Sequence, residues 1–164
     1  MSEQLQAIDH SAIKVSQVTV VGLNILAFVF NAPVLATLVA GVMLLGALFG
    51  FPGFGFIYRW VLKPLGLAKP YVLMDHREPH RFAQGLGGLF MAGGSLALFA
   101  GLPPLGWSLV WLVAALAALN AFAGFCVGCM LYYWLARFKV PGFRKSPPQD
   151  TFPGMRPKTR VYES

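Results

Sequence analysis

Asn120-Ala-Phe-Ala-Gly-Phe-Cys-Val-Gly-Cys129 lies within a long apolar run and contains both cysteines of the chain, in a C-x-x-C spacing. If this segment is helical, positions three apart share one face, so both sulfurs point the same way. The two Cα atoms then lie within the range that a disulfide tolerates. C-x-x-C is a common redox arrangement, but cysteines are also common buried core residues. The spacing alone leaves two interpretations open: a functional thiol pair, or two small apolar core residues.

The composition of the chain is that of a membrane protein. Of its 164 residues, 57% are hydrophobic and only 12% are charged, whereas an ordinary soluble domain is about 25% charged. The mean hydropathy is +0.63. The formal net charge of +7 does not indicate nucleic-acid binding, because the basic residues do not interleave with aromatic ones as they do in nucleic-acid modules. We therefore expect the lipid bilayer as a partner and no nucleic acid.

Four apolar segments predict membrane-spanning helices, at about residues 13–30, 34–51, 82–100 and 107–135. Each approaches or exceeds the ~20 residues that cross a bilayer. The turns at Asn31-Ala-Pro33 and Gly101–Gly106 join the segments in pairs. The last segment is longer than needed, so it is tilted, bent or extended into the interface. The expected fold is an all-α membrane protein with four transmembrane helices arranged as two hairpins.

The segment between the second and third spans is polar. Residues 57–63 place aromatics beside cations, which predicts a short interfacial helix. His76 and His80 are four residues apart, a spacing that suits a metal only on a continuous helix. Pro79 lies between them and disfavours such a helix. We therefore expect a solvated loop with a helix that starts at Pro79, and no metal site.

The basic residues predict the orientation. Five lie between residues 51 and 81 and seven from Arg137 onward, whereas the two turns on the other side hold none. The positive-inside rule then places both termini in the cytoplasm of a bacterial inner (plasma) membrane. Residues 1–138 are the expected four-helix transmembrane domain. Residues 139–164 are expected to form a basic, Pro-rich cytoplasmic tail that is extended or disordered.

The same topology places both cysteines in the cytoplasmic half of the membrane, with Cys129 nearer the surface than Cys126. A thiol in apolar surroundings reacts slowly unless a cation, a helix N-terminus or a polar group lies nearby. The candidate supporting residues are at the cytoplasmic end of the third span and deeper in the fourth: His80, Arg81, Gln84 and Asn120. Gly124 and Gly128 form a G-x-x-x-G pattern, which permits close helix packing beside the cysteines.

Two motifs carry a family resemblance. Pro79-His-Arg-Phe-Ala-Gln84 and the segment from Asn120 to Cys129 resemble the R-F-A-Q and N-x-x-x-G-F-C-x-G-C patterns of a bacterial four-span membrane family, a domain of unknown function. The resemblance covers residues 8–138. The chain departs from the family pattern at Asp9-His10-Ser11, where D-P-R is common, and at Met130, where an acidic residue often follows. The resemblance implies an association with thioredoxin-like or sulfur-transfer proteins and favours functional thiols.

Three functions follow as hypotheses. In the first, Cys126 and Cys129 are the catalytic residues of a membrane thiol–disulfide oxidoreductase that exchanges with a thioredoxin-like or sulfurtransferase protein. Cys129, as the more exposed sulfur, is attacked first and Cys126 resolves. No motif requires a cofactor, but one pair cannot relay electrons across a membrane, so a quinone, a second subunit or a movement of the fourth span is needed.

The second hypothesis is transport or binding of a sulfur species, as a persulfide, or of a soft metal such as Cu(I) through two thiolates. The third is a structural subunit of a membrane complex or a homo-oligomer. The chain has no nucleotide-binding glycine loop and no Ser-His-Asp arrangement that would indicate another reaction.

Overall fold

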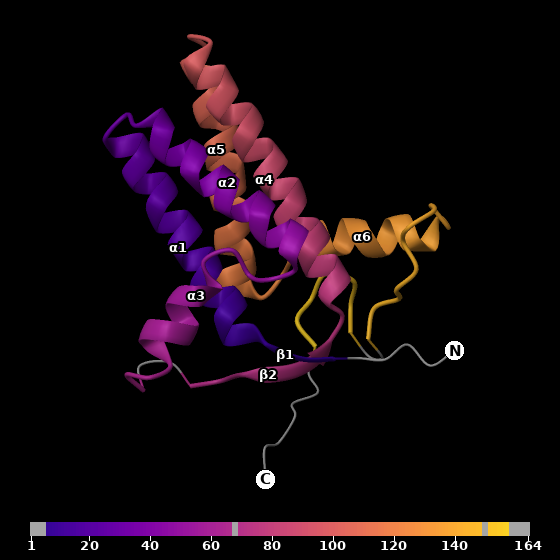
Figure 1. Cartoon of the computed structure of the whole chain (residues 1–164). Helices are drawn as coiled ribbons and strands as arrows, with labels where there is room; N and C mark the ends of the chain where they lie inside the picture. Colours follow the sequence, from indigo (N-terminus) through magenta and orange to yellow (C-terminus); the bar gives the residue numbers. More distant parts are fainter. Residues whose placement is uncertain (1–5, 67–68, 149–150, 158–164) are drawn as a thin grey trace.

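The protein is mostly helical in the computed structural model, which describes residues 6–66, 69–148 and 151–157 (Figure 1). The helices are α1 (His10–Val29), α2 (Pro33–Phe49), α3 (Gly55–Ile57), α4 (Arg77–Phe99), α5 (Pro103–Ala118) and α6 (Val127–Arg137). Two π-helical turns, η1 (Tyr58–Leu62) and η2 (Leu119–Ala123), continue α3 and α5. Two strands, β1 (Gln6–Asp9) and β2 (Val72–Asp75), pair with each other.

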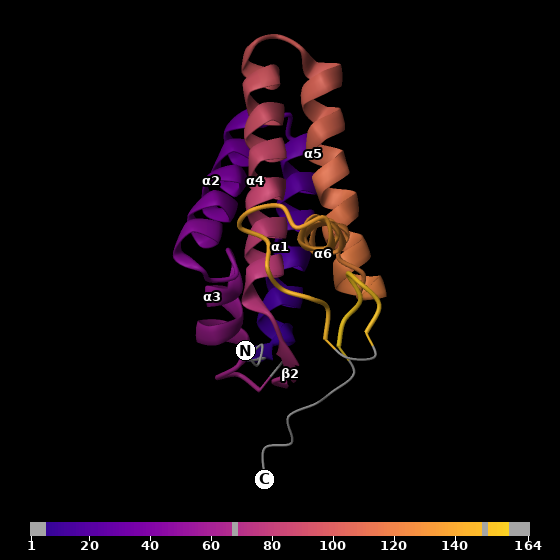
Figure 2. The same ribbon diagram turned by 90° about the vertical axis from the view of Figure 1, so that its right-hand side faces the viewer.

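The body of the molecule is a bundle in which α1, α2, α4 and α5 run alongside one another (Figures 1 and 2). Its core contains Val20, Val39, Met91 and Val110, one from each helix. Asn24 is buried in this core, and its Nδ2 donates a hydrogen bond to Met91 Sδ at 3.6 Å. The amide nitrogen of this mid-helix residue is thus bound by a neighbouring helix, whereas its Oδ1 is buried without a hydrogen-bond partner in the described part of the chain.

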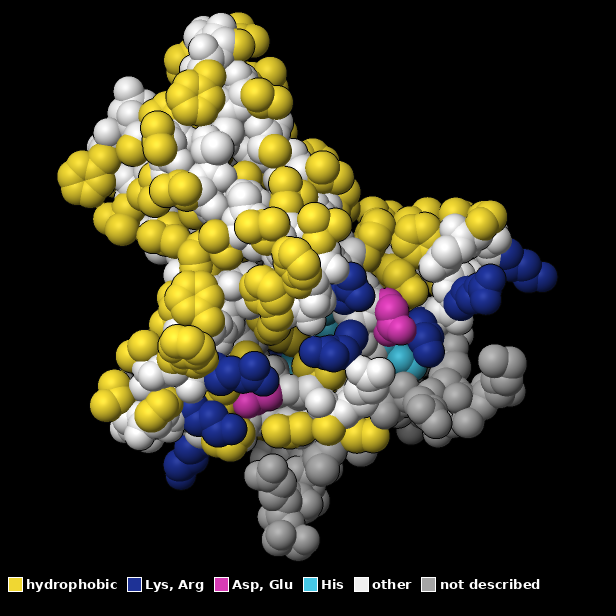
Figure 3. Space-filling model, viewed as in Figure 1, with side chains coloured by type: hydrophobic (Ala, Val, Ile, Leu, Met, Phe, Trp, Pro, Cys, Tyr) yellow, Lys and Arg dark blue, Asp and Glu magenta, His cyan; other side chains and the backbone are white. Residues whose placement is uncertain are grey.

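The outward faces of the bundle are apolar. Leu38, Leu48, Leu96 and Phe99 are all more than half exposed, and Figure 3 shows hydrophobic side chains over the upper part of the molecule and Lys and Arg only lower down. Three helical segments are long and apolar enough to cross a membrane: His10–Val29, Arg77–Phe99 and Pro103–Ala123. Helix α2 is apolar but has only 17 residues. Three of the four predicted spans therefore meet the length requirement.

The predicted fourth span, residues 107–135, is not one helix. Helix α5 and η2 end at Gly124, whose φ of 69° is left-handed. Helix α6 then leaves crosswise to the bundle (Figure 1). Glycine adopts this backbone conformation without steric cost, which is why the chain can turn sharply inside an apolar run. Of the alternatives for the overlong segment, the bend is the correct one. The prediction that both cysteines lie within one continuous helix is wrong.

The fold also contains a small sheet that the sequence did not predict. Strands β1 and β2 pair antiparallel, with Gln6 opposite Asp75 and Asp9 opposite Val72. The ladder continues into α1, because His10 N–H donates to Tyr71 O at 2.8 Å. Asp9 caps α1 by accepting from Ser11 N–H at 2.9 Å. The sheet ties the start of α1 to the segment before α4, so the first residues of both helices lie close together.

Helix α4 begins two residues before the predicted start at Pro79. The proline lies in the first turn, where backbone N–H groups have no intrahelical acceptor, so its missing donor costs nothing. The predicted loop therefore ends at His76, and His80 is helical. The short helix predicted at residues 57–63 is observed as α3 and η1.

Helix α6 packs across α4 through small residues. A Cβ atom added at Gly128 would lie 2.6 Å from Ala83 Cβ and 2.8 Å from Ala83 Cα. Gly128 therefore sets how closely α6 approaches α4, as the small-residue pattern predicted. Gly124, in contrast, is the turn residue before α6 and does not form a helix-packing pair with Gly128.

We predict that Gly128→Ala lowers the free energy of unfolding by about 1–3 kcal/mol, because the added methyl overpacks the contact with Ala83. The control is Gly22→Ala on α1, where an added Cβ meets nothing within 4 Å. That change should be neutral or stabilising by up to ~1 kcal/mol, since alanine is the better helix former. Denaturant unfolding in detergent measures both. Equal effects of the two substitutions would contradict the packing role.

Candidate functional site

The two cysteines lie at the N-terminus of α6. After Gly124 the chain is extended, and Cys126 is the N-cap residue of α6 with φ −101° and ψ 104°. Its Sγ accepts a hydrogen bond from Cys129 N–H at 3.2 Å, in the place where serine or aspartate oxygens usually cap a helix. Cys126 and Cys129 form a disulfide with their Cα atoms 5.2 Å apart. The predicted proximity of the sulfurs is confirmed, although it arises at a helix start.

This position matters for thiol chemistry. The N-terminus of a helix carries partial positive charge and free N–H groups, which stabilise a thiolate. Cys126 is 7% exposed and Cys129 3% exposed. The prediction that Cys129 is the more exposed cysteine is therefore not supported, because the first turn of α6 packs on α4 and directs Cys129 toward His80.

A C-terminal segment, residues 151–157, covers the cysteine motif; we call it the strap. Met155 forms a β-bridge with Phe125. Cys126 N–H donates to Gly154 O at 2.7 Å, and Arg156 N–H donates to Gly124 O at 3.0 Å. A strap tied by backbone hydrogen bonds differs from the extended or disordered tail that the composition predicted, since these bonds need no apolar pattern.

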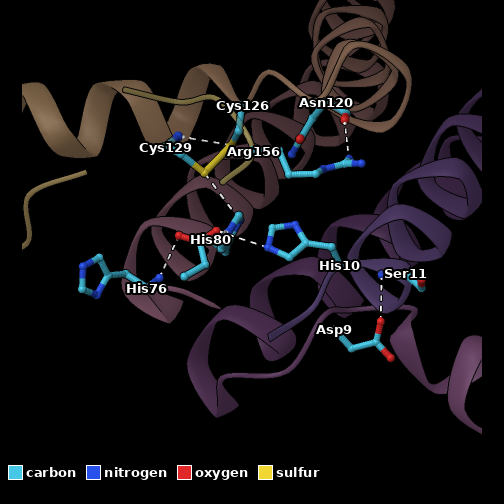
Figure 4. A network of polar contacts seen from close by, with 10 residues as sticks. Asp9, His10, Ser11, His76, His80, Asn120, Cys126, Cys129 and Arg156 are labelled. Carbon is cyan, nitrogen blue, oxygen red and sulfur yellow. Dashed lines mark hydrogen bonds and ion pairs between the residues drawn. A yellow bond between two sulfur atoms is a disulfide. The ribbon is translucent and has the colours of Figure 1, made fainter. Parts of the chain in front are cut away.

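His80 on α4 faces the disulfide. Its Nδ1 lies 3.5 Å from Cys129 Sγ, and its Nε2 lies 2.8 Å from Asp75 Oδ2. Asp75 Oδ1 accepts from His76 N–H at 2.8 Å. Figure 4 shows His80 between the cysteines and the end of β2. The row of carboxylate, imidazole and sulfur orients the ring in the way that cysteine–histidine catalytic pairs require.

The charge of Asp75 determines which tautomer neutral His80 adopts. Burial raises the pKa of Asp75, but hydrogen bonding to the imidazoles of His10 and His80 and to His76 N–H outweighs burial and holds that pKa well below its ordinary value. The carboxylate is therefore ionised and can only accept hydrogen bonds. In neutral His80 the proton must then reside on Nε2, which leaves the Nδ1 lone pair directed at Cys129. His80 is placed to take a proton from the Cys129 thiol when the disulfide is reduced.

His10, the first residue of α1, completes the cluster. Its Nε2 lies 3.3 Å from Asp75 Oδ2, and its ring meets His80 edge-on with centroids 5.5 Å apart. One ligand atom each from His10, Asp75 and His80 lie within 4.8 Å of one another, an arrangement that could hold a metal ion. These are nitrogen and oxygen ligands, which suit zinc or iron better than Cu(I).

A family model described as a domain of unknown function, DUF4395, matches residues 8–137 of the chain. The chain belongs to the DUF4395 family. No curated protein and no solved structure matches it. The match starts within β1, spans β2, all of the helices and both cysteines, and ends at the last residue of α6.

Of the supporting residues predicted for this DUF4395 protein, only His80 has a side chain at the sulfurs. Arg81 donates to Ala47 O at 3.0 Å and to Leu48 O at 2.9 Å. Gln84 donates to Met43 O at 2.9 Å. Arg81 thus binds two of the last carbonyls of α2, which lack helical partners, whereas Gln84 binds a carbonyl further inside the same helix. Asn120 takes part through its backbone carbonyl, which accepts from Arg156 Nη2 at 3.3 Å (Figure 4).

Sequence reasoning missed three residues of the site: His10, Asp75 and Arg156. Each is polar and borders an apolar helix or the cysteine motif, and this position could have identified them as candidate site residues. Their convergence depends on the β1–β2 pairing and on the strap, and both are backbone contacts between segments distant in sequence.

We predict that Asp75→Asn removes a pH-dependent part of the stability. Because the folded pKa of Asp75 is depressed below its ordinary 3.8, the carboxylate stabilises the fold above about pH 4, and this stabilisation is lost as pH falls below it. Asp75→Asn should cost on the order of 2 kcal/mol at neutral pH and flatten the loss of stability on acidification. Unfolding in detergent at about pH 7 and about pH 3 measures this.

The control for Asp75→Asn is Glu78→Gln, which makes the same chemical change at an exposed position of the first turn of α4. It should leave the acid dependence unchanged. An Asp75→Asn variant with the wild-type pH profile would contradict the buried ionised carboxylate.

Proposed function

We propose that this protein catalyses thiol–disulfide exchange in a membrane, with Cys126 and Cys129 as the reacting pair and a thioredoxin-like protein as partner. The observation that carries the proposal is the disulfide at the start of α6, with His80 3.5 Å from Cys129 and Asp75 behind His80. A structural cysteine pair needs no such neighbours. The helix N-terminus, the imidazole and the carboxylate are the features that lower thiol pKa values and accept thiol protons.

The exchange begins at Cys126. A partner thiolate attacks Cys126 Sγ, the bond between the two cysteines breaks, and the electron pair leaves on Cys129 sulfur. A second partner thiol then attacks the mixed disulfide and releases Cys126 as a thiolate, which the N-terminus of α6 stabilises. The partner dithiol is oxidised to a disulfide, and the cysteine pair is reduced. In the reverse direction His80 Nδ1 accepts the proton of Cys129 as this thiol attacks the mixed disulfide.

The order of the two cysteines differs from the sequence-based expectation. Cys126 is the N-cap, is slightly more exposed and borders the larger cavity of the protein, whereas Cys129 is deeper and faces His80. A resolving thiol needs the base more than the attacked one does. This division of roles supports Cys126 as the site of attack and Cys129 as the resolving residue.

The strap limits how a protein reaches this pair. Its hydrogen bonds to Gly124 and Cys126 close the site on one side. A thioredoxin-like partner would displace residues 154–156, which are attached to the motif by a few backbone hydrogen bonds and by the bond from Arg156 to Asn120 O.

The proposed location is a bacterial inner membrane, with α1, α2, α4 and α5 as four spans and both termini in the cytoplasm. Arg59, Arg77 and Arg81 lie at the end of the bundle where the strap and the β1–β2 pair also lie, which supports this orientation by the positive-inside rule. The short α2 would cross with local bilayer thinning, at a cost of fractions of a kcal/mol per ångström of mismatch.

We predict that a cytoplasm-active reporter fused after Ser164 is active and that a periplasm-active reporter at the same position is not, because the basic clusters flank the cytoplasmic side of the spans. Paired fusions of a periplasm-active and a cytoplasm-active reporter provide the measurement, and fusions in the turn after Phe99 are the opposite control. Periplasmic activity of the C-terminal fusion would overturn the orientation while leaving the thiol chemistry intact.

We predict that a thioredoxin variant without its resolving cysteine forms a stable mixed disulfide with the purified chain, and that peptide mapping finds it on Cys126. The single remaining thiol of the probe can attack but cannot release itself.

His80→Gln should slow the reoxidation of the reduced pair about 10²-fold or more, since the proton acceptor for Cys129 is lost.

The matched control is His76→Gln at the N-cap of α4, the same chemical change at a ring that points away from the sulfurs (Figure 4). The Cys126→Ser, Cys129→Ser double variant should form no adduct. A pair that stays reduced under every oxidant would rule out redox function. If the double variant then also lost uptake of sulfur compounds or copper, transport would replace exchange, and full function of that variant would indicate a structural subunit.

A further inference from the structure

A large cavity runs from Cys126 into the bundle. Its volume is about 540 Å³, within the range of pockets that hold small organic molecules. Its apolar walls come from three helices and include Ile13 and Val20 of α1, Phe90 of α4 and Leu116 of α5. Phe90 and Leu116 are also exposed on the outside of the bundle, so this side of the cavity borders the apolar surface. Cys126 and His80 line the same cavity. The site therefore opens into apolar space on the side away from the strap.

The disulfide separates this cavity from a much smaller one. The second cavity, about 20 Å³, lies under the strap and is lined by Cys126, Cys129, His80 and Gly154. It has room for about one water molecule. A small reactant therefore reaches the sulfur of Cys126 through the larger cavity, whereas the strap side admits a reactant only when the strap moves.

The larger cavity also contains a polar atom that lacks a partner. Gln17 Oε1 is buried and has no hydrogen-bond partner in the described part of the chain, and Gln17 lines the cavity wall. A buried acceptor without a donor costs about 1–3 kcal/mol. A ligand that places a hydroxyl group in an otherwise apolar pocket would satisfy it. A hydrocarbon chain would not.

We propose that this cavity binds a lipid-soluble quinone, which reoxidises the cysteine pair. This inference rests on the proposed exchange reaction and names its electron acceptor. A quinone has an apolar ring and chain that suit the walls, and its reduced form carries hydroxyls that can donate to Gln17 Oε1. It reaches the site from the bilayer, so the strap can stay closed. One cysteine pair needs such an acceptor, since electrons received from a partner must leave it.

The reaction balances with the residues present. Cys126 and Cys129 each lose a proton, a sulfur–sulfur bond forms, and two electrons pass to the quinone. Its two carbonyl oxygens take two protons and become the hydroxyls of the quinol. The proton of Cys129 travels through His80 Nδ1, and that of Cys126 is already lost to solvent as the thiolate at the helix N-terminus. The quinol leaves into the lipid and the disulfide is restored.

A phospholipid is the main competing occupant. Arg59, Arg77 and Arg81 also line the cavity, and an acyl chain could enter its apolar part. Arg81 is held by the carbonyls of Ala47 and Leu48, however, and an acyl chain leaves Gln17 Oε1 without a donor. The unpartnered amide and the reactive sulfur on the wall favour the quinone.

The test uses the full chain, purified in detergent, reduced with dithiothreitol and desalted. Decylubiquinone should oxidise the pair, with one quinol formed for each disulfide and a rate that saturates with quinone concentration. Ala117→Phe, which fills the cavity from α5, should slow this oxidation by roughly tenfold or more. Gln17→Leu should raise the concentration of decylubiquinol that halves the rate by product inhibition, because only the reduced form can donate a hydroxyl to Gln17 Oε1. Oxidation by the soluble reagent diamide should be unchanged in both variants.

The matched control is Ala115→Phe, the same substitution on the same helix at an exposed position outside the cavity. It should behave as the wild type with decylubiquinone. No oxidation by decylubiquinone, or equal rates in Ala117→Phe and Ala115→Phe, would overturn the proposal. If the thioredoxin variant is still trapped in that case, exchange stands and only the acceptor is wrong. If diamide also fails to form the disulfide, the exchange function itself fails.

Discussion

The left-handed backbone of Gly124 is the constraint on which the site depends. The helix formed by α5 and η2 ends at Gly124, although the apolar run continues beyond it, and the backbone is then extended until α6 starts. Cys126 thereby becomes a helix cap, and its sulfur accepts the N–H of Cys129. The extended backbone around Phe125 also provides the edge on which the strap pairs. In a continuous helix every one of these backbone groups would be occupied by the helix itself.

A second constraint brings the imidazoles to the sulfurs. The β1–β2 pair holds the start of α1 beside the start of α4, and Asp75 at the end of β2 lies next to His10 and His80. Burial of this charged carboxylate costs free energy, and the hydrogen-bond donors around it offset that cost. The pair of strands is short, yet it determines which ring faces the disulfide and which nitrogen of that ring carries the proton.

Much of the helical architecture could be predicted from the sequence, because apolar length is a direct signal of a helix in lipid. The closeness of Cys126 and Cys129 and the nearness of His80 were predicted as well. The direction of α6 was not, since Gly124 was interpreted as a packing residue and its backbone conformation cannot be deduced from a G-x-x-x-G pattern. Arg81 and Gln84 were expected at the sulfurs, but backbone carbonyls of α2 bind both side chains. The strap and the sheet are held by backbone hydrogen bonds between segments that are distant in sequence, and such bonds produce no clear residue pattern in the sequence.

The strap has a consequence for biogenesis. Residues 151–157 leave the ribosome after all of the helices, so the bundle can insert and the sulfurs can meet before their cover exists. During that interval the nascent site is open to the cell's own oxidants and reductants. The first oxidation state of the pair would then be established by whichever of these reaches Cys126 first, and from the moment the last segment closes only the proposed partner and the larger cavity give access to it.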